Sequence, residues 1–140
     1  MASNHIDMSN KVVLITGGSR GLGLAMALAF AEAGADLIIT SRKIDSCEAT
    51  AAEIEALGRH AMPYACHVGH WDQVDGLVEA AYERFGRIDV LINNAGMSPH
   101  YGRPDEISED LYDKVLDVNL KGTFRLCANV GQRMVDGTGG

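Results

Sequence analysis

Short runs of consecutive apolar residues alternate along the chain with longer segments whose apolar residues recur at helical spacing. The runs that predict strands are 12–15, 36–40, 60–65 and 88–92, and the segments that predict helices are 22–33, 47–54, 74–85 and 108–135. Gly34, Gly58 and Gly86 follow the first three helices, where a helix C-terminus favours glycine. Strands that alternate with helices in this way predict βαβ units and a parallel sheet.

The first run, Val12 to Ile15, is continuous rather than alternating, which is typical of a parallel strand covered on both faces. The segment 22–33 is almost wholly apolar and predicts a buried helix. We therefore expect an α/β fold, a Rossmann-type doubly wound parallel sheet with strand order 3-2-1-4. Residues 1–140 are expected to form one domain, incomplete at its C-terminal end, because the turn at 136–140 predicts a further strand.

The last predicted helix has Ser108 as its expected N-cap, and Glu109 and Asp110 suit its positive end. Its apolar residues lie on more than one face, so we expect it to pack against the sheet and against something else. A chain that ends after this helix would leave the fourth strand as an edge and one apolar helix face uncovered. This predicts that the isolated polypeptide is poorly soluble or oligomeric.

Composition and charge narrow the class of protein. The net charge is −7 and the pI about 5.1, so phosphate backbones would repel the chain and nucleic-acid binding is disfavoured. The first ten residues form neither a secretory signal nor a membrane span, and we expect a cytoplasmic protein with no membrane partner. Cys47, Cys66 and Cys127 are widely spaced and are expected to be buried and reduced.

A glycine-rich turn, Thr16-Gly17-Gly18-Ser19-Arg20-Gly21-Leu22-Gly23, connects the first strand to the first helix. At the carboxyl edge of a parallel sheet such a turn offers backbone N–H groups and a positive helix end to an anion, and glycine lets a pyrophosphate approach the backbone. The spacing is Gly-x-x-x-Gly-x-Gly rather than the Gly-x-Gly-x-x-Gly dinucleotide fingerprint. The residues expected to bind a dinucleotide here are Gly17, Ser19, Arg20, Gly21, Leu22 and Gly23.

This turn resembles the glycine signature of the short-chain dehydrogenase/reductase family, which begins with threonine and has the same spacing. Asn93-Asn94-Ala95-Gly96, after the fourth strand, is similar to the family's second signature, and Asp117-Val118-Asn119-Leu120-Lys121-Gly122 is similar to the segment with its structural catalytic asparagine. The resemblance implies that Asn93, Ala95 and Gly96 bind the cofactor and that Asn119 is a catalytic residue. Gly122 is unfavourable within a helix, so we also expect a local distortion near Asn119.

The end of the second strand bears on the choice of nicotinamide cofactor. In this fold an acidic residue there binds the ribose 2′-hydroxyl of NAD, whereas an arginine accommodates the 2′-phosphate of NADP. The strand ends Ser41-Arg42, and Asp36 lies at its beginning. We expect Arg20 and Arg42 to converge on the phosphate, with Ser41 beside them, which favours NADP(H) over NAD(H).

Two residues after the third strand complete the expected cofactor contacts. His67 and Val68 lie in Cys66-His67-Val68-Gly69, where the family often has Cys-Asp-Val. His67 either contacts the adenine or points to solvent, and a similar run in carbonyl reductases of the family slightly favours a ketone or aldehyde substrate. No metal site is predicted, because His60, His67 and His70 have no partner carboxylate at suitable spacing. The loop from Met97 to Tyr101 is expected to border the substrate.

By resemblance, the reaction is hydride transfer between the nicotinamide and a small-molecule carbonyl or alcohol, with a tyrosine as acid/base, a lysine beside it and a serine. None of the four tyrosines has a lysine four residues later. The 140 residues are therefore expected to be the inactive front half of an NADP(H)-dependent oxidoreductase that is a homo-oligomer in its full-length form. The alternative is a non-catalytic dinucleotide-binding module that senses cofactor or pairs with a partner.

Overall fold

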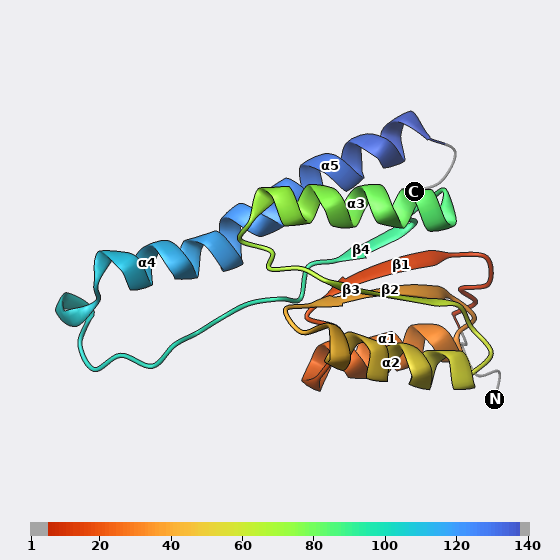
Figure 1. Cartoon of the computed structure of the whole chain (residues 1–140), viewed down its shortest axis with the longest axis horizontal. Helices are drawn as coiled ribbons and strands as arrows, with labels where there is room; N and C mark the ends of the chain where they lie inside the picture. The colour runs from red at the N-terminus through yellow and green to blue at the C-terminus, as the bar shows by residue number, and fades with distance from the viewer. Residues whose placement is uncertain (1–5, 138–140) are drawn as a thin grey trace.

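The computed structural model describes residues 6–137 and contains a parallel sheet with helices on both of its faces (Figure 1). The four strands lie in the order β3-β2-β1-β4, and they are β1 (Val12–Thr16), β2 (Asp36–Ser41), β3 (Ala61–Ala65) and β4 (Val90–Ile92). The α-helices are α1 (Gly21–Glu32), α2 (Ile44–Ala56), α3 (Trp71–Phe85), α4 (Glu109–Leu116) and α5 (Gly122–Asp136). The predicted α/β fold and strand order are confirmed.

Each face of the sheet buries its own apolar cluster, because successive residues of a strand point to opposite faces. Val13 and Ile15 of β1 pack in the cluster on the side of α1 and α2. Val12 and Leu14 pack in the cluster on the side of α3 and α5. β1 is therefore buried along its whole length, as its continuous apolar run predicts.

Two expectations about burial are wrong. α1 is covered on one side only, since its buried residues are small ones and Leu22 is 70% exposed. Gly23, Ala27 and Ala31 are the buried residues of α1, and its larger residues Met26, Leu28 and Phe30 are only partly buried against the same cluster. Cys127 is exposed on α5, whereas Cys47 and Cys66 are buried. Of the tail predicted to introduce another strand, residues 138–140 lie outside the described part of the chain.

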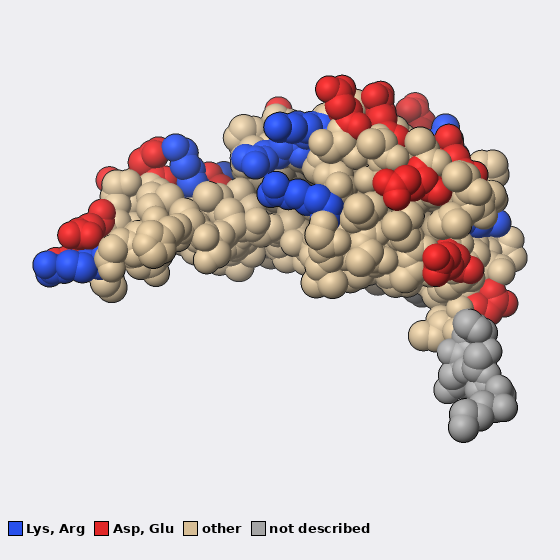
Figure 2. All heavy atoms as spheres, turned by 90° about the horizontal axis from the view of Figure 1, so that it is seen from below, with Lys and Arg blue, Asp and Glu red and all other residues tan. Residues whose placement is uncertain are grey.

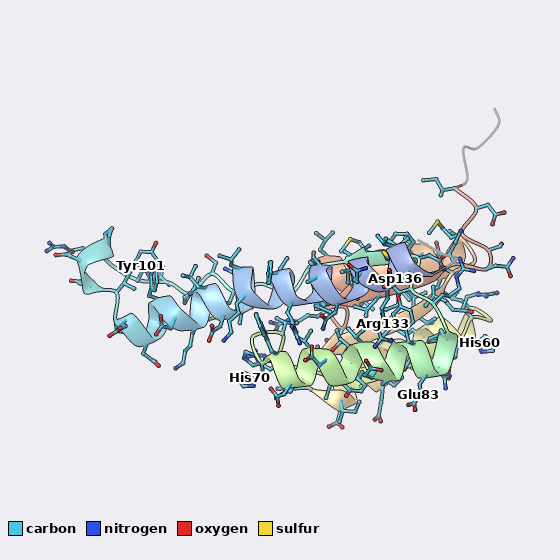
Figure 3. The ribbon with its side chains drawn as sticks, turned by 90° about the horizontal axis from the view of Figure 1, so that it is seen from above. His60, His70, Glu83, Tyr101, Arg133 and Asp136 are labelled. Carbon is cyan, nitrogen blue, oxygen red and sulfur yellow. The ribbon has the colours of Figure 1, made fainter. Side chains whose placement is uncertain are left out.

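α4 and α5 are two parts of one long helical rod, joined by the π-helical turn η2 (Asp117–Lys121). The N–H of Gly122 donates to the carbonyl of Asp117, five residues earlier, so the predicted distortion near Asn119 is confirmed. The Oγ of Ser108 accepts a hydrogen bond from the N–H of Leu111 at 3.2 Å, as expected of the N-cap. The α4 end projects beyond the sheet (Figures 1 and 3).

The two faces of this rod differ in their surroundings. Leu126 and Val130 of α5 are fully buried in the cluster beneath α3. Leu120 and Phe124, on another side, are each 62% exposed in the described structure. Within residues 6–137, no helix has both the length and the apolar composition that crossing a lipid bilayer requires.

The start of α5 comes unusually close to the segment after β3. A Cβ added at Gly122 would lie 2.2 Å from the carbonyl oxygen of Val68, which is far inside van der Waals contact. Further along the same helix, a Cβ added at Gly131 would meet no atom of the described residues within 4 Å, the adjoining helix backbone aside. Close approach therefore explains the glycine at position 122, and it does not explain the one at position 131.

At the opposite edge of the sheet, Asp89 joins the amino ends of β1 and β4. Its carboxylate accepts a hydrogen bond from the N–H of Val12 at 2.8 Å and pairs with Arg87, while its side chain is only 4% exposed. Burial alone would raise the pKa of Asp89, but the hydrogen bonds from Arg87 and Val12 more than offset this and hold the pKa below its ordinary value.

The variant Gly122→Ala is expected to lower the free energy of unfolding by about 1–3 kcal/mol, because Val68 must move to admit the methyl group. Gly131→Ala, the matched control, is expected to raise it by about 0.5–1 kcal/mol, since alanine favours a helix and meets nothing there. Urea unfolding of both variants checks this. Changes of the same sign would contradict the close approach.

The variant Asp89→Asn is expected to lower the free energy of unfolding at pH 7 by about 1–3 kcal/mol, because Arg87 and Val12 lose a charged acceptor. The folded pKa of Asp89 lies below its unfolded value, so its contribution is present above the unfolded pKa and is lost as the pH falls through the folded pKa. The difference from wild type should therefore shrink below about pH 4.

Asp105→Asn is the control, because both side chains of its ion pair with Arg103 are exposed. This variant should lower the free energy of unfolding by less than about 0.5 kcal/mol at any pH. Urea unfolding at several pH values measures both variants. Equal losses for the two, or a loss for Asp89→Asn that persists in acid, would show that Asp89 does not join the strands as described.

Candidate functional site

A cleft of about 800 Å³ follows the carboxyl ends of all four strands. Its walls come from the segments 17–23, 40–46, 66–68 and 94–99, each of which follows or ends a strand, and from Val118 of η2. In open parallel sheets, ligands bind in the crevice outside this edge. The position of the cleft is therefore that of a ligand site.

The cleft brings together every predicted cofactor contact except Asn93. The lining residues among these are Gly17, Ser19, Arg20, Gly21, Leu22, Gly23, Ser41, Arg42, His67, Val68, Ala95 and Gly96. Asn93 lies beside the cleft, and its Nδ2 contacts the Sγ of Cys127 on α5 at 3.3 Å. The loop after β4 lines the cleft from Asn94 to Pro99, whereas Tyr101 lies far out on the projecting arm (Figure 3).

Thr16 and Asn94 hold the ends of β1 and β4 together. The Oγ1 of Thr16, which is 1% exposed, accepts hydrogen bonds from the N–H groups of Asn94 at 3.0 Å and Ala95 at 2.9 Å. In return, the Nδ2 of Asn94 donates to the carbonyls of Thr16 and Gly17, both at 3.1 Å. Sequence reasoning missed Asn94 as a site residue, although the Asn-Asn pair of the second signature was the available signal.

The start of α1 is open to an external anion. Its N-cap, Arg20, makes no side-chain capping hydrogen bond, and the first turn contains no acidic residue. The earliest helical hydrogen bond runs from the N–H of Leu24 to the carbonyl of Arg20 at 3.2 Å, and the N–H groups before it have no intrahelical partner. The first turn therefore presents uncompensated positive charge at the cleft.

Glycine is sterically required in this turn. A Cβ at Gly23 would lie 2.0 Å from the carbonyl oxygen of Gly17, so α1 could not begin so close to β1 with any other residue. Gly17 and Gly21 have φ angles of +64° and +54°, in the left-handed region that favours glycine. The bend thus reverses direction tightly and leaves the backbone accessible from the cleft.

The charge around the cleft is of one sign. Arg20, Arg42 and Lys43 line it, and none of its described lining residues is Asp or Glu, although the chain has a net charge of −7. Figure 2 shows a gathering of Lys and Arg side chains near the middle of the face that carries α1 and α2. Sequence reasoning did not name Lys43 as a site residue, and its place next to Arg42 was the signal.

His67 lies on the wall of the cleft, in a turn that fixes its ring. Its Nδ1 accepts a hydrogen bond from the N–H of Gly69 at 3.2 Å, and its ring stacks on His70 with 4.4 Å between centroids. Burial, followed by the nearby His70 and Arg42, lowers the pKa of His67 below its ordinary value. The lowered pKa favours the neutral imidazole, and because Nδ1 accepts from Gly69, the proton of the neutral ring is on Nε2.

Asn119 lies outside the cleft lining and holds one of its walls. Its Oδ1 accepts a hydrogen bond from the N–H of Met97 at 2.8 Å, and its Nδ2 donates to the carbonyl of Met97 at 2.8 Å. Met97 lines the cleft, as does Val118 next to Asn119. The Asn119 side chain therefore holds the segment after β4 through the backbone of Met97.

Comparison with known proteins agrees with this arrangement. The family model described as short chain dehydrogenase matches residues 11–140. Dehydrogenase/reductase SDR family member 4 of Bos taurus is 35% identical over 95% of this chain and 48% of its own length. A hydroxy(phenyl)methyl-succinyl-CoA dehydrogenase subunit, BbsD of Thauera aromatica, is 40% identical over 92% of this chain and 52% of its own. The chain thus spans about half the length of these relatives.

Solved structures show the same similarity in three dimensions. A short-chain type dehydrogenase/reductase from Mycobacterium marinum superposes with a TM-score of 0.89 at 34% identity, over 95% of this chain and 52% of that one. A metagenomic short-chain oxidoreductase in complex with NADP gives 0.89 at 32%, over 92% and 58%. An NAD+-bound xylitol dehydrogenase gives 0.88 at 31%, over 92% and 50%.

The family match covers nearly the whole chain, and the solved relatives superpose closely on its fold. One of these solved relatives is in complex with NADP and another is bound to NAD+. Both relatives thus bind a nicotinamide dinucleotide, but in different forms. The chain belongs to the short-chain dehydrogenase/reductase family.

Proposed function

We propose that this chain binds NADP(H) and is part of an oxidoreductase that moves a hydride between this cofactor and a small-molecule carbonyl or alcohol. The observation that carries the proposal is the charge of the cleft, which has three cationic side chains and no carboxylate among its described lining residues. A phosphate at the ribose 2′ position carries up to two negative charges and would be repelled by an acidic residue there.

The residues present fit such a cofactor. The glycines of the bend at positions 17, 21 and 23 have no side chains that would cover its backbone, and the uncapped start of α1 suits a diphosphate. Arg42 after β2 and Arg20 in the bend are the proposed ligands of the 2′-phosphate, with Ser41 beside them. Because His67 and Val68 follow the neighbouring strand β3, they are the proposed contacts of the adenine.

The segment after β4 is the proposed wall for the rest of the cofactor. Ala95 and Gly96 line the cleft there, and Asn93 supports the segment from the side of α5. When bound, the nicotinamide supplies the hydride acceptor or donor. Asn119 contributes by holding Met97 in place, which is a positioning role.

The variant Arg42→Ala in the full-length protein is expected to raise the Kd for NADPH by about 10- to 100-fold, the effect of losing a charged hydrogen bond. The Kd for NADH should change by less than about threefold, because NADH has no 2′-phosphate. Fluorescence titration of both cofactors measures this. Arg103→Ala is the matched control, since Arg103 lies outside the cleft and pairs with Asp105 at the surface.

Similar affinities of the wild type for NADPH and NADH would remove the case for a phosphate site at Arg20 and Arg42. So would equal losses for the two cofactors in Arg42→Ala, because this would mean that Arg42 supports the fold rather than the phosphate. Arg103→Ala should leave both affinities unchanged.

The variant Thr16→Val is expected to lower the free energy of unfolding by about 1–3 kcal/mol, because two part-buried N–H groups lose their acceptor. It should also weaken NADPH binding, since Asn94 and Ala95 are then free to move away from the glycine turn. Thr16→Ser keeps the hydroxyl and should retain most of both properties. Urea unfolding and cofactor titration measure the pair, and equal behaviour of valine and serine would exclude this role for the hydroxyl.

A further inference from the structure

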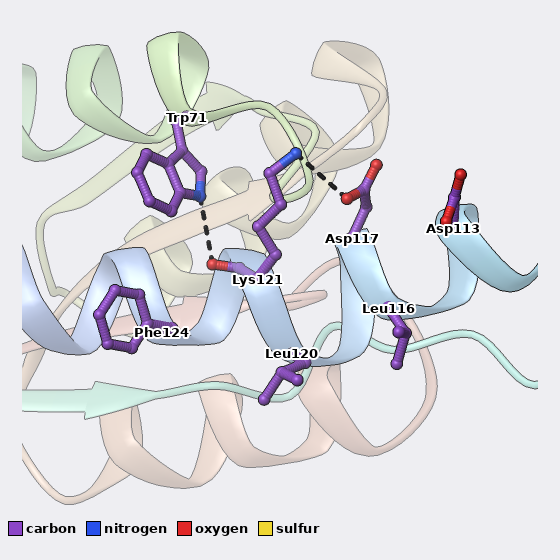
Figure 4. Close-up of a pocket in the computed structure, with 7 residues that line it drawn as sticks. All are labelled: Trp71, Asp113, Leu116, Asp117, Leu120, Lys121 and Phe124. Carbon is purple, nitrogen blue, oxygen red and sulfur yellow. Dashed lines mark hydrogen bonds and ion pairs between the residues drawn. The ribbon is translucent and has the colours of Figure 1, made fainter.

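A second groove lies on the outer side of the rod, next to the start of α3 (Figure 4). Trp71, the first residue of α3, lines it together with Leu120, Lys121 and Phe124 of the rod. The indole Nε1–H of Trp71 donates a hydrogen bond to the carbonyl of Lys121 at 3.3 Å. Lys121 is the last residue of the π-turn η2, so this bond connects α3 directly to the backbone of that turn.

A π-turn needs support from its neighbours, because π-helical hydrogen bonding is rare and occurs mostly as single turns within α-helices. If η2 returned to α-helical bonding, the residues on one side of it would rotate by about 100° relative to the other. The side chain of Asn119 would then leave Met97, with which it now exchanges two hydrogen bonds of 2.8 Å. The form of η2 therefore decides where the wall at Met97 lies.

Contacts from the segment after β3 hold η2 from one side. Gly122 lies against the carbonyl of Val68, so closely that no Cβ would fit, and this fixes the C-terminal end of the turn. The Trp71 bond fixes the carbonyl of Lys121, the residue before it. Both Val68 and Met97 line the cofactor cleft, so η2 connects two of its walls.

The Trp71 ring is itself held firmly. The Arg125 guanidinium lies over it at 4.7 Å from the ring centroid, and the Phe124 ring stacks beside it at 6.4 Å. Arg125 is oriented by two hydrogen bonds to Asp75, one turn further along α3, at 2.8 and 2.7 Å. The Arg125 guanidinium, oriented by Asp75, thus aims the indole N–H, whereas the Phe124 ring packs beside it.

We propose that Trp71 is a positioning residue for the cofactor site: its indole N–H keeps η2 in the π form, and Asn119 thereby keeps Met97 on the wall of the cleft. The structural part of this inference concerns η2 and Met97 alone. Its effect on cofactor affinity rests on the proposed function.

The test compares the full-length wild type with Trp71→Phe, which loses the N–H but keeps a ring between Phe124 and Arg125. Amide hydrogen exchange by NMR, without ligand, should show the N–H of Met97 exchanging at least about fivefold faster in the variant, the factor for losing a hydrogen bond. The N–H of Leu14 in β1 reports global unfolding, so the Met97 rate is read relative to it. The Kd for NADP+ should rise by about the same factor.

Phe124→Leu is the matched control, since it removes the neighbouring ring and leaves the bond from Trp71 to Lys121 intact. Its relative Met97 exchange should stay within about twofold of wild type. A second variant replaces Trp71 with its benzothiophene analogue, in which sulfur takes the place of the N–H. It keeps the packing, so it tests the donor even if phenylalanine disturbs the fold.

Unchanged Met97 exchange in both Trp71 variants would overturn the inference, and so would equal acceleration in Phe124→Leu. Acceleration of Met97 in the Trp71 variants with no such effect in the control would support it. A wild type that binds neither NADP+ nor NAD+ would refute the proposed function, and the exchange result for Met97 would still stand or fall separately.

Discussion

The ligand site of this chain depends on the unsatisfied backbone N–H groups at the start of α1. A helix that begins directly after a buried strand exposes these groups at the sheet edge, and here neither a capping side chain nor an acidic residue compensates them. The close approach of Gly23 to the carbonyl of Gly17 is what brings the helix start to this position. An anion bound there would satisfy both the hydrogen bonds and the helix dipole.

The rest of the cleft is held together by side-chain hydrogen bonds between segments that are far apart in the sequence. Thr16 and Asn94 join the ends of β1 and β4, and Asn119 joins the rod to Met97. Each of these hydrogen bonds uses polar atoms that would otherwise be unpaired at the end of a strand or turn. The side chains that line the cleft are thereby held on rigid elements, which favours a preorganised site.

The sequence predicts the strands, the helices and the glycine turn because these follow from local periodicity and from the steric needs of single residues. Gly34, Gly58 and Gly86 all have positive φ angles, as their places after helices suggest. What local patterns do not contain is the direction of side chains after a strand ends. Hence Asn93 was expected in the cleft, whereas Asn94 lines it, and Lys43 was overlooked. Trp71 could not be foreseen, because its partner at Lys121 is 50 residues away.

The central claim is that the backbone N–H groups between Gly17 and Gly23 receive the diphosphate of the cofactor. The most direct measurement is a titration of the 15N-labelled full-length protein with NADP+, followed through the amide resonances of this segment. The account predicts saturable shifts of these amides, with those at the far end of α2 unaffected. Binding that leaves the amides of residues 17–23 unperturbed, or shifts confined to another part of the chain, would contradict it.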